Sequence, residues 1–277
     1  MFNLTDTHND LLTALPYNKQ IKFICNLSKN VKAINLAVFT THKNLGINKI
    51  KKHKQKLLTL QKLTNTNLLF SVEDIGSIPP YKIDELIKLK PFCVSLTWNL
   101  KNCYAGGALS TNGITKCGKQ AIKKLEENNI LIDTAHLNRK SFWQFAKLTT
   151  KPLLCTHCNI NALHKHPRNL TNKQIKKVVD SNGFIGLTLY KNFISNNKIN
   201  SKHIAKQIDY LIKKFGYKNF GFGTDFFGIN KKDLPTNIKC YADFSQISTE
   251  LKNMGYSNKV IHHIFHQNFT NFLNRIK

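Results

Sequence analysis

Two short apolar runs that each end in a histidine constrain the fold of this chain most. Residues 130–136 end in His136, and residues 153–157 end in His157. The segment between them places apolar residues at helical spacing, so we expect a strand, a helix and a second strand. Because consecutive strands of a parallel sheet point the same way, both histidines should lie at its carboxyl edge, where α/β proteins carry their chemistry.

Similar apolar runs recur along the chain and alternate with helical segments. The strand candidates lie at residues 2–10, 32–39, 67–73, 92–98, 130–136, 153–157, 184–189 and 219–225. Eight strands that alternate with helices are typical of a (β/α)8 barrel. No linker divides the chain, so we predict an α/β fold, a TIM-like (β/α)8 barrel, as a single domain over residues 1–277.

Composition limits where such a chain would reside. The 277 residues are 41% hydrophobic, which suffices for a large core. Seven cysteines, an odd number, and the lack of an export signal favour reduced thiols over a disulfide framework. No apolar run approaches the length of a membrane span. We therefore expect a cytoplasmic protein without a membrane anchor.

The net charge of +27 raises the question of a nucleic-acid partner, because clustered Lys and Arg neutralise phosphates. The lysines are, however, spread along the whole chain. They accompany abundant Asn and Ile, which is the bias of a genome rich in A and T. We therefore predict no specific nucleic-acid partner, while acidic partners stay open as an alternative.

Residues that bind metals or transfer protons stand at the ends of these apolar runs. They come from the first, third, fifth, sixth and eighth strand candidates: His8, Asp10, Glu73, His136, His157 and Asp225. A surface position is the ordinary alternative for any one of them. In a barrel, however, all these strand ends meet at one rim. We therefore expect the six side chains to form one site.

Three imidazoles with carboxylates are the ligands of a two-metal hydrolytic site, since zinc takes N and O ligands together. We expect His8 and Asp10 on one cation, His136 and His157 on the other, and Glu73 bridging two Zn²⁺ or other divalent metals. Such a pair can hold a bridging hydroxide and polarise a carbonyl. Asp225 is then free for proton transfer. Asp133, on the opposite strand face, is expected to support the barrel or the site rather than bind metal.

Six motifs resemble, in order and spacing, those of the membrane (renal) dipeptidase family of zinc metallopeptidases, and the chain resembles a soluble, bacterial-type member of it. The likeness spans nearly the whole chain. The motifs are Asp6-Thr-His-Asn-Asp-Leu11, Ser71-Val-Glu-Asp74, Leu131-Ile-Asp-Thr-Ala-His-Leu137, Thr156-His157, Arg168-Asn-Leu170 and Gly221-Phe-Gly-Thr-Asp-Phe226.

The resemblance implies hydrolysis of dipeptides, including those with a D-residue on the C-terminal side. It implies that Arg168 holds the substrate carboxylate and that Asp225 contacts the free amine and relays protons, so that Glu73 and Asp225 are the catalytic residues. Trp98 stands where characterised members carry a substrate-binding histidine, and Phe227 stands where the family usually has an acid. An indole N–H can donate but cannot become cationic, so we expect Trp98 to bind substrate and to alter its preference.

Two other functions stay open. Another barrel amidohydrolase, acting on a cyclic amide or lactone, would more often present His-x-His on its first strand. A catalytically decayed basic binding protein would explain the charge of +27 and Trp98, although five intact ligand positions argue against decay. A homodimer is an open alternative to a monomer.

Overall fold

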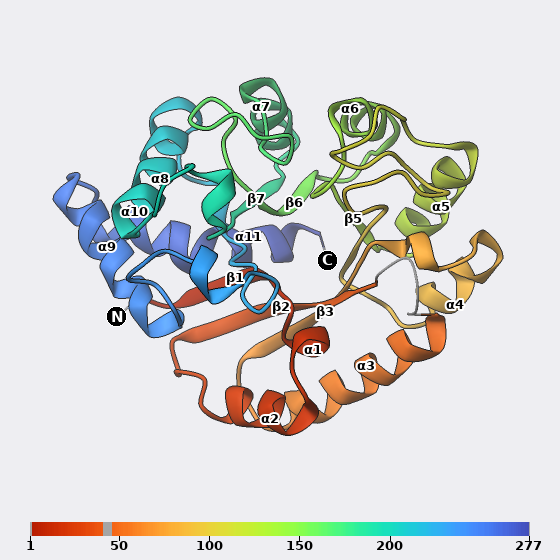
Figure 1. Ribbon diagram of the computed structural model, residues 1–277, viewed down its shortest axis with the longest axis horizontal. Coiled ribbons are helices and arrows are strands. Elements are labelled where there is room, and N and C mark those ends of the chain that lie inside the picture. Colours follow the sequence, from red (N-terminus) through yellow and green to blue (C-terminus); the bar gives the residue numbers. More distant parts are fainter. Residues whose placement is uncertain (1, 41–45, 277) are drawn as a thin grey trace.

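Eight parallel strands form a closed barrel in the part of the chain that the structure describes, a computed structural model covering residues 2–40 and 46–276 (Figure 1). The strands follow one another in chain order: β1 (Leu4–Asn9), β2 (Val31–Phe39), β3 (Asn67–Glu73), β4 (Cys93–Ser95), β5 (Leu131–Asp133), β6 (Leu154–Cys158), β7 (Phe184–Leu187) and β8 (Phe220–Phe222). β1 pairs with both β2 and β8, which closes the barrel. The predicted (β/α)8 barrel is therefore confirmed.

Helices connect the strands and surround the barrel (Figure 1). They are α1 (Leu11–Ala14), α2 (Tyr17–Cys25), α3 (Ile47–Gln61), α4 (Ile83–Ile87), α5 (Lys116–Glu127), α6 (Arg139–Leu148), α7 (Asn172–Asp180), α8 (Ser201–Phe215), α9 (Phe244–Asn253), α10 (Asn258–His262) and α11 (Asn268–Arg275). A π-helical segment, His263–Gln267, joins α10 to α11. Short 3-10 turns lie at Ile75–Ser77, Pro80–Lys82, Lys191–Phe193, Lys231–Asp233 and Tyr241–Asp243.

Strands β4, β5 and β8 have three residues each and are shorter than the sequence predicted. Trp98, His136 and Asp225 consequently lie in the turns that follow these strands, and the prediction that they end their strands was wrong. His136 and Asp225 have φ angles of 70° and 62°. A β ladder requires negative φ, so neither residue can extend its strand.

The amino ends of four strands are closed by the last helix. A buried apolar cluster joins the first residues of β4, β5, β6 and β7 to two rings of α11; its members are Cys93, Leu131, Leu154, Phe184, Phe269 and Phe272. The rings of Phe184 and Phe269 are centred 5.1 Å apart. Apolar side chains therefore close the amino ends of β4 to β7.

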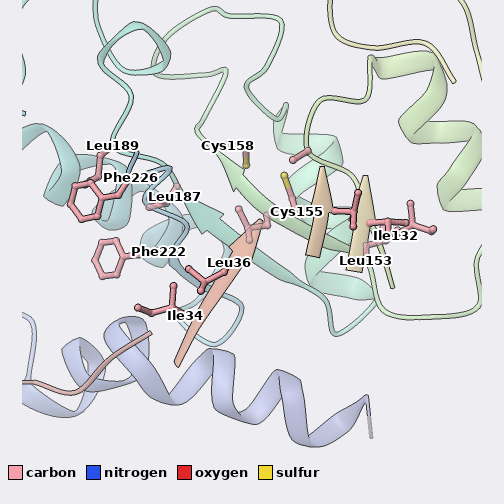
Figure 2. Close-up of a cluster of buried hydrophobic side chains, with 14 of the residues drawn as sticks. Ile34, Leu36, Ile132, Leu153, Cys155, Cys158, Leu187, Leu189, Phe222 and Phe226 are labelled. Carbon is pink, nitrogen blue, oxygen red and sulfur yellow. The ribbon is translucent and has the colours of Figure 1, made fainter. Parts of the chain in front are cut away.

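A larger apolar core holds the strands in register. Figure 2 shows part of it, with side chains from β2, β5, β6, β7, β8 and the turns beside them: Ile34, Leu36, Ile132, Leu153, Cys155, Cys158, Leu187, Leu189, Phe222 and Phe226. None of these is more than 5% exposed. Full burial of one such Leu or Phe contributes about 1.5–3 kcal/mol. The strand ends that carry the polar residues are therefore anchored in a rigid frame.

All seven cysteines lie in the described residues and are free thiols. Cys155 and Cys158, on either side of His157, are buried, and burial raises the pKa of the Cys158 thiol well above its usual value. Within residues 2–40 and 46–276, no helix is both long and apolar enough to cross a bilayer.

Candidate metal centre

Three imidazole rings meet at the carboxyl ends of the strands. His8 lies on β1, His157 lies on β6, and His136 lies in the turn after β5; none is more than 6% exposed. The Nε2 atoms of His136 and His157 are 2.9 Å apart. The rings of His8 and His157 are centred 3.8 Å apart. The barrel therefore brings together three histidines from distant parts of the sequence.

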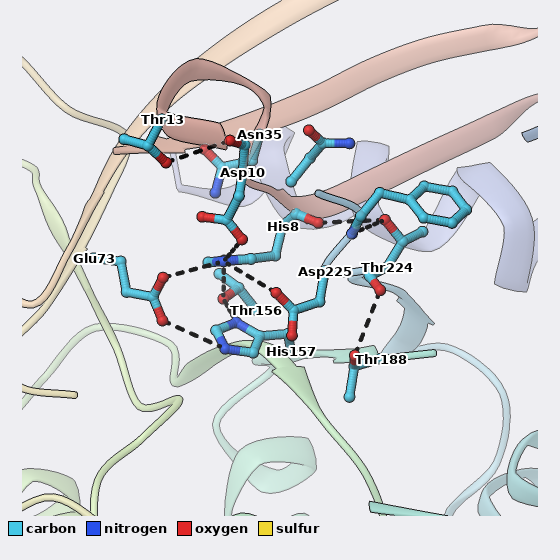
Figure 3. A network of polar contacts seen from close by, with 12 residues as sticks. His8, Asp10, Thr13, Asn35, Glu73, Thr156, His157, Thr188, Thr224 and Asp225 are labelled. Atoms are coloured by element: carbon cyan, nitrogen blue, oxygen red, sulfur yellow. Dashed lines mark hydrogen bonds and ion pairs between the residues drawn. The ribbon is translucent and has the colours of Figure 1, made fainter. Parts of the chain in front are cut away.

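Glu73, the last residue of β3, faces the rings of His8 and His157 (Figure 3) and also contacts His136. Its Oε2 is 3.5 Å from Nε2 of His8. Its Oε1 is 2.6 Å from Nε2 of His136 and 3.7 Å from Nε2 of His157. The two oxygens thus face two different groups of imidazoles, which is the arrangement that a bridging carboxylate needs.

Two further carboxylates approach His8. Its Nε2 is 3.5 Å from Oδ2 of Asp10 and 4.0 Å from Oδ1 of Asp225 (Figure 3). Asp10 follows the end of β1 and has φ −94° and ψ 17°. An extended strand over residues 2–10, as predicted, would have placed His8 and Asp10 on one face; instead β1 ends at Asn9, and a turn brings Asp10 to His8.

Burial and neighbouring charges give the three imidazoles different pKa values. Burial, assisted by the positive charge of Arg168, lowers the pKa of His136 to about 3. Burial also lowers the pKa of His157 well below its usual value, with His8 as the next cause. Both rings are therefore neutral at physiological pH, the form that binds metals. Burial acts the same way on His8, but the carboxylates of Asp10 and Glu73 outweigh it and raise the pKa of His8 well above its usual value.

The pKa values of the carboxyl groups of Glu73 and Asp225 are shifted in opposite directions. Burial by itself would raise the pKa of Glu73, but the charges and hydrogen bonds of His136 and His8 lower it well below its usual value. Burial, followed by the negative charge of Asp10, raises the pKa of Asp225 well above its usual value. Neighbouring carboxyl groups with opposite pKa shifts are typical of sites that transfer protons.

Hydrogen bonds on the outer side of the rings show which nitrogens face the centre. Nδ1 of His136 is 3.0 Å from Oδ1 of Asn99. Nδ1 of His157 is 3.0 Å from the hydroxyl of Thr156. With Nδ1 as the donor in each ring, the Nε2 lone pairs of His136 and His157 face each other at 2.9 Å and repel unless a cation lies between them. Nitrogen and oxygen donors in this arrangement fit zinc or a similar divalent cation.

Asp133 lies behind the rings. One of its oxygens comes within 4.8 Å of ring nitrogens of His8 and His157. Its Oδ1 accepts from the backbone N–H groups of Thr156 and Ala135, at 2.9 and 3.0 Å, and its Oδ2 accepts from the Thr156 hydroxyl at 2.5 Å. Because both oxygens are used in this way, we assign Asp133 a supporting role rather than a place among the ligands.

Asp6 is a residue of the site to which sequence reasoning assigned no role. It is fully buried and accepts from the backbone N–H and hydroxyl of Thr224, at 2.8 and 2.6 Å, and from the hydroxyl of Tyr241 at 2.7 Å. These bonds fix the turn that carries Asp225. The signal that could have found Asp6 is an acid inside an apolar strand, two residues before His8. Nothing in the sequence distinguished Asn99.

A cavity of about 610 Å³ opens from these ligands to the surface. Trp98 and Phe227 line it together with Phe39, Tyr190 and Phe193, so aromatic rings lie beside the polar residues in its walls. Trp98 is 38% exposed, and its ring is centred 5.4 Å from that of Phe39. The volume suits a small molecule rather than a protein chain.

Arg168 and Asp225 also line this cavity. Arg168 is only 6% exposed, and its guanidinium lies 5.3 Å from the ring centre of Phe193. Burial lowers the pKa of Arg168, and its Nε has no hydrogen-bond partner among the residues that the structure describes. A buried guanidinium with free donors on a cavity wall is suited to an anionic group of a ligand.

Gly228 permits two carboxylates to lie against the backbone. A Cβ at this position would be 2.3 Å from Oδ2 of Asp10 and 2.5 Å from Oδ1 of Asp225. Both distances are far below van der Waals contact. The residue after Phe227 must therefore be glycine for Asp10 and Asp225 to keep their places.

A parallel barrel with imidazoles and carboxylates at the carboxyl ends of its strands defines the class of metal-dependent barrel hydrolases. Residues 15–277 match the model of the membrane dipeptidase family, peptidase family M19, and the chain belongs to this family. It is therefore a hydrolase of the metallo-dipeptidase class, which confirms the resemblance seen in the sequence. His8 and Asp10 precede the matched residues.

Two bacterial proteins are similar to this chain in sequence. An uncharacterised Klebsiella pneumoniae protein from the pqqA 5′ region is 30% identical over 194 residues, 65% of this chain and 70% of that protein. An uncharacterised Acinetobacter calcoaceticus protein from the PQQ-III 3′ region is 30% identical over 105 residues, 38% of this chain and 33% of that protein.

Two solved structures show the same fold. The dipeptidase AC of family M19 superposes with a TM-score of 0.86 at 18% identity, covering 99% of this chain and 98% of that one. A Rhodobacter sphaeroides metallopeptidase, liganded with a phosphinate mimic of the dipeptide L-Ala-D-Ala, superposes with a TM-score of 0.84 at 17% identity, covering 100% and 99%. At these identities the likeness establishes the barrel alone.

Proposed function

We propose that this chain is a two-metal dipeptidase. The observation that carries the proposal is that Glu73 directs one oxygen to His8 and the other to His136. We assign His8 and Asp10 to one cation, His136 and His157 to the other, and Glu73 to both, with zinc as the expected metal. Two such cations would supply hydroxide at neutral pH and polarise the amide carbonyl.

Metal analysis tests this assignment. Purified wild-type protein should contain about two divalent cations per chain, the number that the two ligand groups can hold. Glu73→Gln should lower occupancy at both sites, because a carboxamide keeps only one acceptor oxygen. Glu85→Gln removes a surface carboxylate that pairs with Lys51 and should keep both cations. Full occupancy in Glu73→Gln would contradict the bridging role.

Within the cavity, we propose that Arg168 and Asp225 hold the two ends of a dipeptide. A planar guanidinium can pair with both oxygens of the substrate carboxylate. Asp225 binds the ammonium group and passes protons at the scissile amide. Trp98, whose ring is centred 5.9 Å from that of His136, contacts the substrate beside the metal ligands. The enzyme would then select substrates that carry a free amine and a free carboxylate one peptide bond apart.

Arg168→Lys tests the carboxylate clamp. Lysine keeps the charge but loses the fork, so kcat/KM for a dipeptide should fall by the equivalent of roughly 2 kcal/mol. The C-terminal amide of the same dipeptide should be a poor substrate for the wild type. Arg139→Lys alters an exposed arginine that bonds Asn161 and serves as the control. If wild type cleaves acid and amide equally well, Arg168 is not the clamp.

A D-residue on the C-terminal side is part of the proposal. The Rhodobacter sphaeroides relative was liganded with a mimic of L-Ala-D-Ala, which supports it. Hydrolysis of L-Ala-D-Ala beside L-Ala-L-Ala tests it directly. Metal binding without hydrolysis of any dipeptide would favour the decayed binding protein, and activity on cyclic amides or lactones alone would favour another amidohydrolase.

The free thiols support a reducing, cytoplasmic setting for the enzyme. Localisation of the tagged protein tests this placement, and recovery outside the cytoplasm would contradict it. Sedimentation of the metal-loaded protein distinguishes a monomer from the homodimer.

A further inference from the structure

The hydroxyl of Thr156 contacts two imidazoles that we assign to different cations. Its Oγ1 is 3.0 Å from Nδ1 of His157 and 3.3 Å from Nδ1 of His8 (Figure 3). Thr156 lies on β6 directly before His157 and is completely buried. One hydroxyl therefore joins the outer sides of both rings, while Glu73 faces their inner sides.

The direction in which this hydroxyl donates its single proton determines which nitrogen of each ring is protonated. A threonine hydroxyl has one proton to donate and two lone pairs to accept with. The hydroxyl donates its hydrogen bond to Oδ2 of Asp133, 2.5 Å away, and Oδ1 of Asp133 accepts from the backbone N–H of Thr156 at 2.9 Å. Only the lone pairs of Oγ1 remain for the rings. Both rings must therefore carry a proton on Nδ1.

A proton on Nδ1 leaves Nε2 as the atom that can bind a metal. Nε2 of His8 is 3.5 Å from Glu73, and Nε2 of His157 is 3.7 Å from it, so both face the proposed cations. The other neutral tautomer would direct an N–H at the cation and prevent binding.

We propose that Asp133 and Thr156 are positioning residues shared by both metal sites, which fix the Nδ1–H tautomers of His8 and His157 and so set the affinity for both cations together. This inference rests on the proposed two-metal function and deepens it. His136 is held separately, because its Nδ1 contacts Asn99 instead. Asn99 therefore serves one site, whereas Thr156 serves two.

Isosteric variants separate this role from packing. Thr156→Val keeps the branched shape but removes the hydroxyl, and it should weaken the binding of both cations by about 10- to 100-fold. Asn99→Leu should weaken the binding of one cation. Thr156→Ser retains the hydroxyl and should restore both affinities. Thr134→Val removes another buried hydroxyl, which donates to the carbonyl of Leu154, and as the matched control it should bind both cations like the wild type.

Asp133→Asn provides a second variant that leaves Thr156 in place. Its amide N–H would donate to Oγ1 and occupy one lone pair, so the hydroxyl proton would turn toward a ring. At least one cation should then bind about tenfold more weakly.

Zinc titration of metal-free protein by calorimetry, with a competing chelator, measures the two affinities, and circular dichroism verifies that each metal-free variant is folded. Weaker binding of both cations in Thr156→Val, with recovery in Thr156→Ser, supports the inference. Unchanged affinities in Thr156→Val and Asp133→Asn overturn it, as does an equal loss in Thr134→Val. A wild type that binds no zinc overturns the proposed function itself, and the inference with it.

Discussion

His136 and Asp225 occupy a backbone conformation that L-residues rarely adopt, with φ of 70° and 62°. Such residues cost of order 1–3 kcal/mol each and persist only where their surroundings hold them. For Asp225, the backbone N–H donates to the carbonyl of His8 at 3.0 Å. Asp and His tolerate this region better than most residues. The site therefore uses residues that can supply both a functional group and a tight turn.

Gly228→Ala should disturb the site more than the addition of one methyl group suggests. The new Cβ would overlap Oδ2 of Asp10 and Oδ1 of Asp225, so at least one carboxylate must move. We expect kcat/KM for a dipeptide to fall by about tenfold or more, consistent with a displacement of about 1 Å.

Gly46→Ala is the matched control, because a Cβ there meets nothing within 4 Å. Steady-state kinetics on both variants, each saturated with zinc, make the comparison. Wild-type activity in Gly228→Ala would show that Asp10 and Asp225 need not lie where the structure places them.

At this scale, the sequence predicted residue types better than contacts. Glu73 and His157 stand out because each ends an apolar run. Asn99 and Asp6 could not be assigned in the same way, because their partners come from distant segments that only the closed barrel brings together. The same holds for the hydroxyl of Thr156, whose role depends on a ring from β1.

Among the elements, α7 shows how a local signal positions the substrate end of the cavity. Thr171 accepts from the backbone N–H of Gln174, whose side chain accepts from the backbone N–H of Thr171 in return, so the two residues form a capping box. Arg168 lies shortly before this cap, at the end of the segment that leaves β6. The start of α7 therefore fixes where the loop carrying Arg168 must finish.

Thr171→Ala should destabilise the protein by about 1 kcal/mol, because the first turn of α7 loses its cap. Urea unfolding measures the change, and Thr171→Ser should keep most of the stability. Thr59→Ala, on the exposed face of α3, is the control and should have little effect. An unchanged unfolding midpoint in Thr171→Ala would show that the cap is dispensable.

The strands were easier to predict than the connections. β3 was predicted with its observed ends, Asn67–Glu73, because its apolar run is long and bounded by polar residues. No helix was predicted from the sequence at α1, α2, α4 or α9. α1 and α4 span four and five residues, too few for a helical period to be visible. Their positions follow from packing against neighbouring elements, which sequence periodicity does not encode.

Across the whole molecule, positive charge is abundant while the acids of the site are buried. The chain has 42 Lys and Arg against 15 Asp and Glu, and Asp6, Asp10, Glu73 and Asp133 are all below 7% exposed. The outside is therefore more basic than the composition alone implies.

Binding to DNA or RNA should nevertheless be weak and should disappear with salt. Lysines spread over the chain can displace counterions from a nucleic acid, which gives salt-dependent attraction, but they form no aligned groove that would make binding tight. Filter binding from about 50 to 200 mM salt tests this, with a strong loss expected across that range. Tight, sequence-selective binding at physiological salt would instead support the alternative of a basic binding protein.

The closure of the barrel also sets the order of events during synthesis. The backbone N–H of Thr224 bonds Asp6 across 218 residues of sequence, and β1 meets β8 only after the last strand has been made. Until β8 has been synthesised, His8 and Asp10 therefore lack the neighbouring strand that holds β1 in place. We therefore expect that a nascent chain does not bind cations. Metal binding should follow release of the complete chain and should depend on the cations available to it then.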